Sequence, residues 1–287
     1  MPSIASGLIF GAYAGTAGAQ NGLLWLREPG ALDRVPLWAL FVITVLVILF
    51  SIEVGFRLAH AVGQRSESER KWPLDEIEAA TLSLLAFMLA FTFGLAASRF
   101  DARRSLIMEE ANALGTTYLR AGILPEPDRT DIRNLLREYL DVRVHAFQSA
   151  KVGGGLAQSE GLQNRLWSEA VAVGEKSPGS IVVGLFIASL NDVIDLHTKR
   201  LTQDRNRIPG SIWAALYAVA ILGMAEVGYH AGLNTTRRGL SIIPLAITVS
   251  AVMLLIADLD RSHEGLLDVS PQPLIDLQNA WSGSSGS

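Results

Sequence analysis

The sequence predicts an all-α integral membrane protein with four transmembrane helices and a cytoplasmic helical domain inserted between helices 2 and 3. The apolar residues, 49% of the 287-residue chain, gather in four stretches long enough to cross a bilayer. A charged, amphipathic segment separates the second stretch from the third. Only 18% of the residues are charged, below the level of about a quarter that is typical of soluble proteins.

The four predicted spans cover residues 36–62, 77–98, 211–233 and 240–259. Each approaches or exceeds about 20 residues, which is the length that crosses a bilayer at 1.5 Å per residue. Pro209 and Gly210 mark the start of the third span, and Asp260 and Arg261 end the fourth. Buried soluble helices this long and this free of charge are uncommon, so the four stretches predict a membrane bundle.

The second span is expected to continue as one long helix beyond the membrane. No helix breaker follows it until Gly122 and Pro125. A single helix can therefore run from Ile77 to Leu119, which is 43 residues and about 64 Å at the standard rise.

The rest of the inserted domain is predicted to hold three further helices. One begins near Asp128 or Thr130 and repeats apolar residues at helical spacing. Residues 151–161 are rich in glycine and are expected to form a loop. Two more helices, over residues 162–173 and 180–206, complete the domain.

This pattern divides the chain into six segments. They are an N-terminal segment (1–35), helices 1 and 2 (36–98), the helical domain (99–208), helices 3 and 4 (209–260), a C-terminal tail (261–281) and a flexible linker or cloning remnant (282–287). No Lys or Arg precedes Arg27, so the positive region of a signal peptide is missing. We expect the first twenty residues to form an interfacial or loosely ordered segment. The alternative is a signal peptide, because the small residues that end in Ala17-Gly18-Ala19-Gln20 resemble a cleavage site.

The distribution of basic residues predicts the orientation in a bacterial inner membrane. With four spans, both termini and the helical domain lie on one side. Ten Lys and Arg residues lie near that side, against five in the two short loops. The excess predicts that the termini and the domain are cytoplasmic.

The chain lacks the residue patterns of enzymes and metal sites. It has no cysteine, and its five histidines do not have metal-ligand spacing. Phosphate loops and nucleophile elbows are missing as well. We therefore expect no catalytic residue, no metal site and no cofactor, and the net charge of −4 gives no reason to expect a nucleic-acid partner.

Three stretches resemble the bacterial bestrophin-like family of unknown function. They are LLAFMLAFTFGLAASRFDARRSLIMEEANALGTTYLRA (residues 84–121), LTQDRNRIPGSIW and LIADLDRSHEGLLDVSPQPLIDL, in that order and at matching positions relative to the spans. A more distant similarity links residues 99–103 to the Asp-Arg-aromatic-x-x-Ala-Arg segment that follows the bestrophin neck, although Asp follows Arg here.

The resemblance implies the design of the bestrophins, which are oligomeric channels, mostly for anions. Their second membrane helix lines the pore and extends into the cytosol. For this chain it implies a homo-oligomer in membrane lipid, with chloride or another small anion as the permeant ion and a cation as the open alternative.

Four apolar residues of the second span lie on one helical face, because they recur at spacings of three and four. In an oligomer with this helix at its axis, they would form apolar rings that gate by dewetting. The alternative is that the stripe packs against neighbouring spans, and a modest rotation would turn Thr81, Met88 and Thr92 into the lumen instead. The predicted neck residues are Leu84, Phe87, Phe91 and Leu95.

Three charged residues follow this face and could form rings at the cytoplasmic mouth. Arg99 and Arg103 would attract anions, whereas Asp101 would favour cations. The alternative for the arginines is interfacial anchoring. Glu109 and Glu110 lie further along the helix and, as adjacent residues, point to different sides of it, so they do not form a general acid-base pair. We expect them to be solvated or to lie at a subunit interface, and the alternative is that they bind a regulatory cation across that interface.

Ionisable residues at membrane depth are functional candidates. We interpret them mainly as ion pairs that fix the helix bundle, with an ion or proton path as the alternative. Glu53 and Arg57 are four residues apart, as are Glu226 and His230, while Asp258 lies one turn before Arg261.

The leading functional hypothesis from sequence is an oligomeric ion channel. The alternative is a non-conducting membrane scaffold or sensor whose helical domain binds a cytosolic partner. A secondary transporter is disfavoured, because the chain has neither an inverted repeat nor broken helices.

Overall fold

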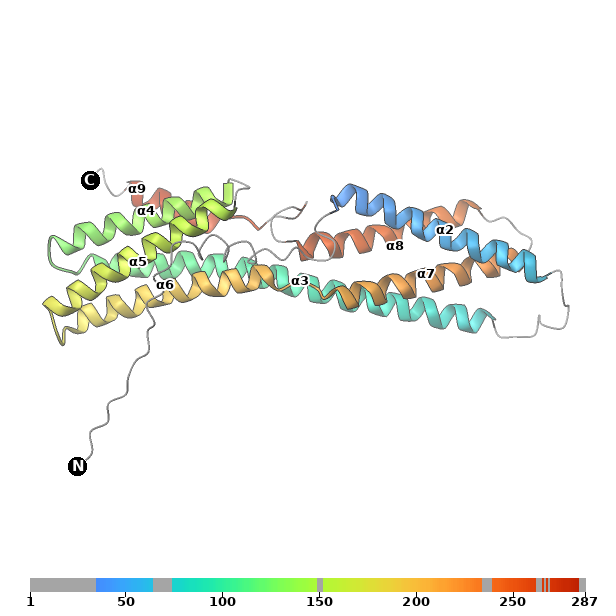
Figure 1. Cartoon of the computed structure of the whole chain (residues 1–287), viewed down its shortest axis with the longest axis horizontal. Coiled ribbons are helices and arrows are strands. Elements are labelled where there is room, and N and C mark those ends of the chain that lie inside the picture. The colour runs from blue at the N-terminus through green and yellow to red at the C-terminus, as the bar shows by residue number, and fades with distance from the viewer. Residues whose placement is uncertain are drawn as a thin grey trace, which may run out of the picture.

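A computed structural model describes residues 35–63, 74–148, 152–233, 239–261, 265, 267 and 269–283. Every regular element in these ranges is a helix, and the helices form two bundles placed end to end (Figure 1). The predicted N-terminal segment up to residue 34, the two short loops and residues 284–287 lie outside the described residues.

The central element of the structure is α3 (Leu74–Ala121), a helix of 48 residues, which is about 72 Å long at the standard rise. It runs through both bundles (Figure 1). The prediction of one continuous helix from Ile77 to Leu119 is therefore confirmed. Gly122 and Pro125 end it, since proline cannot continue the helical hydrogen-bond pattern.

The membrane half contains α2 (Leu37–Gly63), the first part of α3, α7 (Gly210–Leu233) and α8 (Gly239–Asp260). Within the described residues, four helices are long and apolar enough to cross a membrane. Large apolar side chains cover its outside, and Trp38 and Phe50 are 72% and 70% exposed. Such exposure is unfavourable in water and fits a surface that faces lipid, so the four predicted spans are found as four candidate membrane-spanning helices.

Glycines allow α2 and α7 to approach backbone to backbone. A Cβ atom on Gly55 would lie 1.9 Å from the Ala225 carbonyl oxygen, and one on Gly228 would lie 2.0 Å from the Ile52 carbonyl oxygen. Gly228 and Gly232 are four residues apart, a spacing that favours close packing of helices in lipid. This contact holds α2 against α7, which in turn packs against α3.

The distal half contains the second part of α3 with α4 (Asp128–Gln148), α5 (Val152–Lys176), α6 (Ile181–Arg205) and α9 (Gln272–Gly283). Its core is built from fully buried side chains such as Leu136, Leu166 and Phe186. Ser180 caps α6, because its side-chain oxygen accepts the Val183 amide. Phe100 packs against the cores of both halves.

The predicted glycine-rich loop over residues 151–161 is wrong, because α5 already begins at Val152. The cause is a close crossing of helices. A Cβ atom on Gly155 would lie 2.6 Å from the Ala146 Cβ atom of α4, so glycine here serves the packing of two helices and not chain flexibility.

The C-terminal residues form a helix, α9, that includes part of the predicted tail and the first two residues of the predicted linker. α9 packs against α3 and α4, and its Trp281 ring stacks on the Tyr118 ring of α3 with centroids 4.2 Å apart. The end of the chain thus covers the distal half of α3.

Candidate functional site

Helix α3 has an inward face that repeats every seven residues. Each member of this row is buried in the protomer, and the row continues from the membrane half into the distal half. It consists of Leu89, Ala96, Arg103, Glu110 and Thr117. Two of the five are charged, so each needs a partner inside the protein.

The outward face of α3 is a row of uncharged residues with a single charged member. Its residues alternate at spacings of three and four, and all are exposed except the half-buried Gly115. We call this row the α3 seam: Leu84, Phe87, Phe91, Gly94, Ser98, Asp101, Ser105, Met108, Asn112, Gly115 and Leu119. A repeat of 3.5 residues is the pattern by which parallel helices associate.

Most of the predicted neck residues lie on this seam. Leu84, Phe87 and Phe91 are 50%, 67% and 60% exposed, and Leu95 is half-buried beside them. The rings of Phe87 and Phe91 are stacked with centroids 6.4 Å apart. These three side chains therefore point away from the protomer's own bundle, toward lipid or a second copy.

The alternative lumen face turns toward the protomer. Thr92 is only 1% exposed, and its hydroxyl donates a hydrogen bond of 2.7 Å to the Met88 carbonyl oxygen. The Thr81 hydroxyl likewise donates to the Ile77 carbonyl oxygen at 3.0 Å. Both hydroxyls are satisfied by their own helix.

Arg103 points inward and caps the end of α8. Its Nη2 atom donates to the Leu259 carbonyl oxygen at 2.5 Å and to the Arg261 carbonyl oxygen at 3.3 Å. The last carbonyls of a helix have no helical partner and attract cations. The side chain is therefore held where the two halves meet.

Arg99 and Arg207 join the same junction. Arg99 Nη1 lies 3.6 Å from Asp260 Oδ1, and the same oxygen accepts the Ile208 amide at 3.0 Å. Arg207 donates to the Asp260 carbonyl oxygen. The junction thus ties α3, α8 and the start of α7 together.

Asp101 is separated from the arginines on either side of it. Its side chain is exposed on the α3 seam and has no hydrogen-bond or salt-bridge partner in the described part of the chain. The structure therefore places Arg99 and Arg103 on the side of α3 that faces α8, and Asp101 on a different, exposed side.

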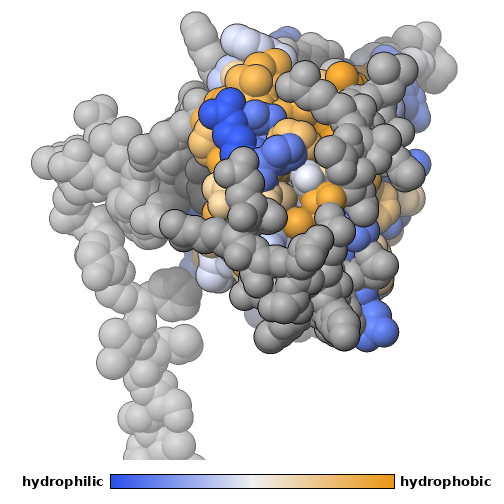
Figure 2. Space-filling model, turned by 90° about the vertical axis from the view of Figure 1, so that its right-hand side faces the viewer, coloured by the Kyte–Doolittle hydropathy of each residue, from blue (hydrophilic) through white to orange (hydrophobic). Residues whose placement is uncertain are grey.

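One of the predicted intramembrane ion pairs is present. Arg57 Nε donates to Glu53 Oε1 at 2.7 Å, on the exposed side of α2. His230 has a different partner from the one its spacing predicts, since its Nδ1 atom lies 3.0 Å from Glu78 Oε2 of α3. Figure 2 shows hydrophilic residues gathered among hydrophobic ones at this end of the molecule.

Of the other two ionisable candidates, Glu226 is half-buried and Asp258 is buried. Glu226 has one carboxylate oxygen, Oε2, with no hydrogen-bond partner among the described residues. Asp258 is 1% exposed, and its Oδ2 atom accepts the Leu267 amide at 3.1 Å. Asp258 thus holds the chain that follows α8.

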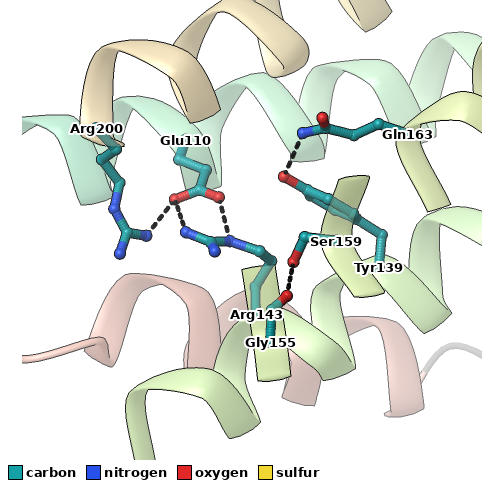
Figure 3. Close-up of polar contacts among 7 residues, drawn as sticks. All are labelled: Glu110, Tyr139, Arg143, Gly155, Ser159, Gln163 and Arg200. Carbon is teal, nitrogen blue, oxygen red and sulfur yellow. Dashed lines mark hydrogen bonds and ion pairs between the residues drawn. The ribbon is translucent and has the colours of Figure 1, made fainter. Parts of the chain in front are cut away.

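A buried ionic network centred on Glu110 lies in the distal half (Figure 3). Arg143 Nε donates to Glu110 Oε1 at 2.8 Å, and Arg200 Nη1 donates to Glu110 Oε2 at 2.7 Å. Glu110 is fully buried, so the expectation that it is solvated is wrong. The burial of Glu110 could have been predicted from the seven-residue repeat of the inward row, in which Arg103 lies seven residues earlier.

The network keeps Glu110 ionised. Burial raises the pKa of its carboxyl, but the guanidinium groups of Arg143 and Arg200 lower it further, and the pKa is about 2. The carboxylate in turn outweighs burial at Arg143 and raises that pKa. The three residues join α3, α4 and α6 at one point.

A histidine lies beside the network at a small cavity of about 40 Å³. His197 is 3% exposed, and neither ring nitrogen has a hydrogen-bond partner among the described residues. Burial and the nearby Arg143 lower its pKa to about 4, so the ring is neutral at physiological pH. The cavity is lined by Arg143, Ala146, Phe147, Leu156, His197, Arg200, Leu201 and Asp204.

Residues 77–274 match a family model described as a Bestrophin-like domain, which covers more than half of the chain. Neither the curated proteins nor the solved structures contain a significant match.

Proposed function

The chain belongs to the bestrophin-like family, and from this premise we propose that it forms a homo-oligomeric ion channel with α3 at its axis. The family suggests an ion-channel-like function and not an enzyme. The observation that supports the proposal is the α3 seam, which stays exposed from Leu84 to Leu119, about 52 Å along the helix.

Lipid covers only part of this seam. Leu84, Phe87 and Phe91 lie in the membrane half, but Met108 and Leu119 lie in the distal half and are 50% and 69% exposed. A large apolar side chain in water is stabilised by a protein partner. A second copy of α3, parallel and in register, covers both parts with the same row.

Charges beside the seam favour a parallel copy. Arg104 lies immediately before Ser105, and Glu109 lies immediately after Met108, so the two charges are five residues apart on opposite flanks of the seam. Parallel helices place these flanks against each other and form salt bridges between them. Both side chains are exposed and have no partner within the described residues.

In such an oligomer Leu84, Phe87 and Phe91 form the apolar neck, which conducts or closes according to its hydration. Leu95 borders it, and Arg99 and Arg103 hold the wall of the mouth to α8. The resemblance to bestrophins implies that the permeant ions are chloride or other small anions. We place the distal half in the cytoplasm of a bacterial cell, as the excess of basic residues favours.

Ion flux into liposomes that carry the purified protein tests the proposal. We expect flux in the wild type, and we expect Phe87→Ala and Phe91→Ala to increase it because smaller rings hydrate more easily. Thr92→Ala is the matched control, since this buried residue faces the protomer. If neither phenylalanine substitution alters the flux, the proposal that α3 lies at the axis is wrong.

A scaffold or sensor is the second candidate. Ile123 and Ile181 are 66% and 79% exposed at the far end of the distal half. The two helix ends near these residues meet, because Arg120 Nη1 donates to the Leu185 carbonyl oxygen at 2.8 Å and joins the end of α3 to the start of α6. An inserted, oligomeric protein without flux in any variant would favour a binding role for this surface.

A further inference from the structure

We propose that Asp101 forms a ring of carboxylates at the distal mouth of the neck and that this ring makes the pore select cations over anions. The inference rests on the proposed channel function, and it reverses the ion class that the resemblance implies. Asp101 is the single charged residue of the α3 seam. It lies ten residues beyond Phe91, about 15 Å along the helix axis.

The arginines that would attract anions are turned away from the seam. Arg103 is 4% exposed and donates to the carbonyl oxygens at the end of α8. Arg99 is half-buried and lies against Asp260. Both guanidinium groups are thus directed toward oxygens at the end of α8, and neither faces the seam.

The exposed charges of this part of α3 sum to a negative value. Between Ser98 and Asn112, the exposed ionisable residues are Asp101, Arg104 and Glu109, two carboxylates and one guanidinium. Arg104 and Glu109 flank the seam and suit a salt bridge between neighbouring subunits. Asp101 remains as the charge that faces the axis, once in every subunit.

The position of the ring decides selectivity, because the neck itself has no charge. The apolar side chains of Leu84, Phe87 and Phe91 disfavour hydrated anions and hydrated cations equally. A ring of like charges at a mouth raises the local concentration of counter-ions by about tenfold or more. Acidic rings act in this way in cation-selective pores.

The reversal potential in a planar bilayer under a tenfold KCl gradient measures the preference directly. A pore that passes only K⁺ gives about 59 mV, and one that passes only Cl⁻ gives the same value with opposite sign. We expect the wild type to lie on the K⁺ side. Asp101→Asn should lower the permeability ratio of K⁺ to Cl⁻ by about tenfold, and Asp101→Arg should reverse the sign.

Asp192→Asn is the matched control, because Asp192 is an exposed carboxylate on α6 that lies off the seam. It changes the net charge by the same amount and should leave the reversal potential unchanged. A wild type on the Cl⁻ side, or one that Asp101→Asn does not shift, would overturn the inference while leaving the channel intact. No current in any variant would overturn the channel itself.

Discussion

The inward and outward faces of α3 differ in how their charged residues are satisfied. On the inward face, Arg103 and Glu110 are buried, and each has partners within the protomer. On the outward face, Asp101 and the flanking Arg104 and Glu109 are exposed and have none among the described residues. A buried charge is costly unless it is paired, so the inward charges belong to folding. The outward charges are available for assembly and for ions.

The largest expected effect is a difference in protein stability between substitutions of two adjacent carboxylates, Glu110 and Glu109. Glu110→Gln should lower the free energy of unfolding by about 3–5 kcal/mol, because it leaves Arg143 and Arg200 without their buried counter-charge. Glu109→Gln should change it by less than about 0.5 kcal/mol, as exposed substitutions do. Chemical denaturation in detergent, followed by tryptophan fluorescence, measures both. Equal effects of the two changes would contradict the inward placement of Glu110.

The second comparison uses two adjacent arginines. Arg103→Gln should destabilise the protomer by about 1–3 kcal/mol, because it leaves carbonyl oxygens at the end of α8 without a donor. Arg104→Gln should leave the protomer stable and shift the oligomer toward smaller species, which size-exclusion chromatography with light scattering detects. An Arg104→Gln variant with an unchanged oligomeric state would contradict the proposed salt bridge between Arg104 and Glu109.

The last effect concerns pH and the buried His197. His197 has a pKa of about 4 in the folded protein against an ordinary value of 6.5, so between these values the unfolded chain binds more protons. Stability is complete above pH 6.5 and falls as the pH drops toward 4, by at most about 1.4 kcal/mol per pH unit.

Unfolding midpoints between pH 7 and 5 measure this loss. His197→Leu should flatten the dependence, whereas His145→Gln, a change at an exposed histidine of α4, should not. Parallel profiles for the wild type and His197→Leu would show that His197 is not the titrating group.

The four spans and the long α3 could be predicted because lipid imposes a simple rule, about 20 apolar residues for each crossing. The rotation of α3 about its own axis could not be predicted from the sequence. Leu84, Phe87 and Phe91 share one face in any rotation, and only the packing of α7 and α8 against α3 decides which face is left open. The helical Gly155 was mispredicted for a similar reason, since its contact with Ala146 of α4 is not encoded locally.

At the candidate site, too, the sequence alone could not predict which side chains contact each other. Arg99, Asp101 and Arg103 appear in sequence as one charged cluster, yet α8 holds both arginines and leaves the aspartate outside. The partner of His230 is Glu78 on another helix, although Glu226 lies at the ideal local spacing. Charges at helical spacing indicate a candidate pair, but tertiary neighbours choose the partner.

Oxidative cross-linking in membranes tests the central claim, that α3 seams meet at the axis of an oligomer. The chain has no cysteine, so single substitutions report single positions. Ser105 lies on the seam, and Thr198 is exposed on α6, two residues before the Arg200 that contacts Glu110. We expect rapid disulfide-linked dimers from Ser105→Cys and few from Thr198→Cys. Efficient cross-linking of Thr198→Cys with none from Ser105→Cys would place another face of the protein at the axis.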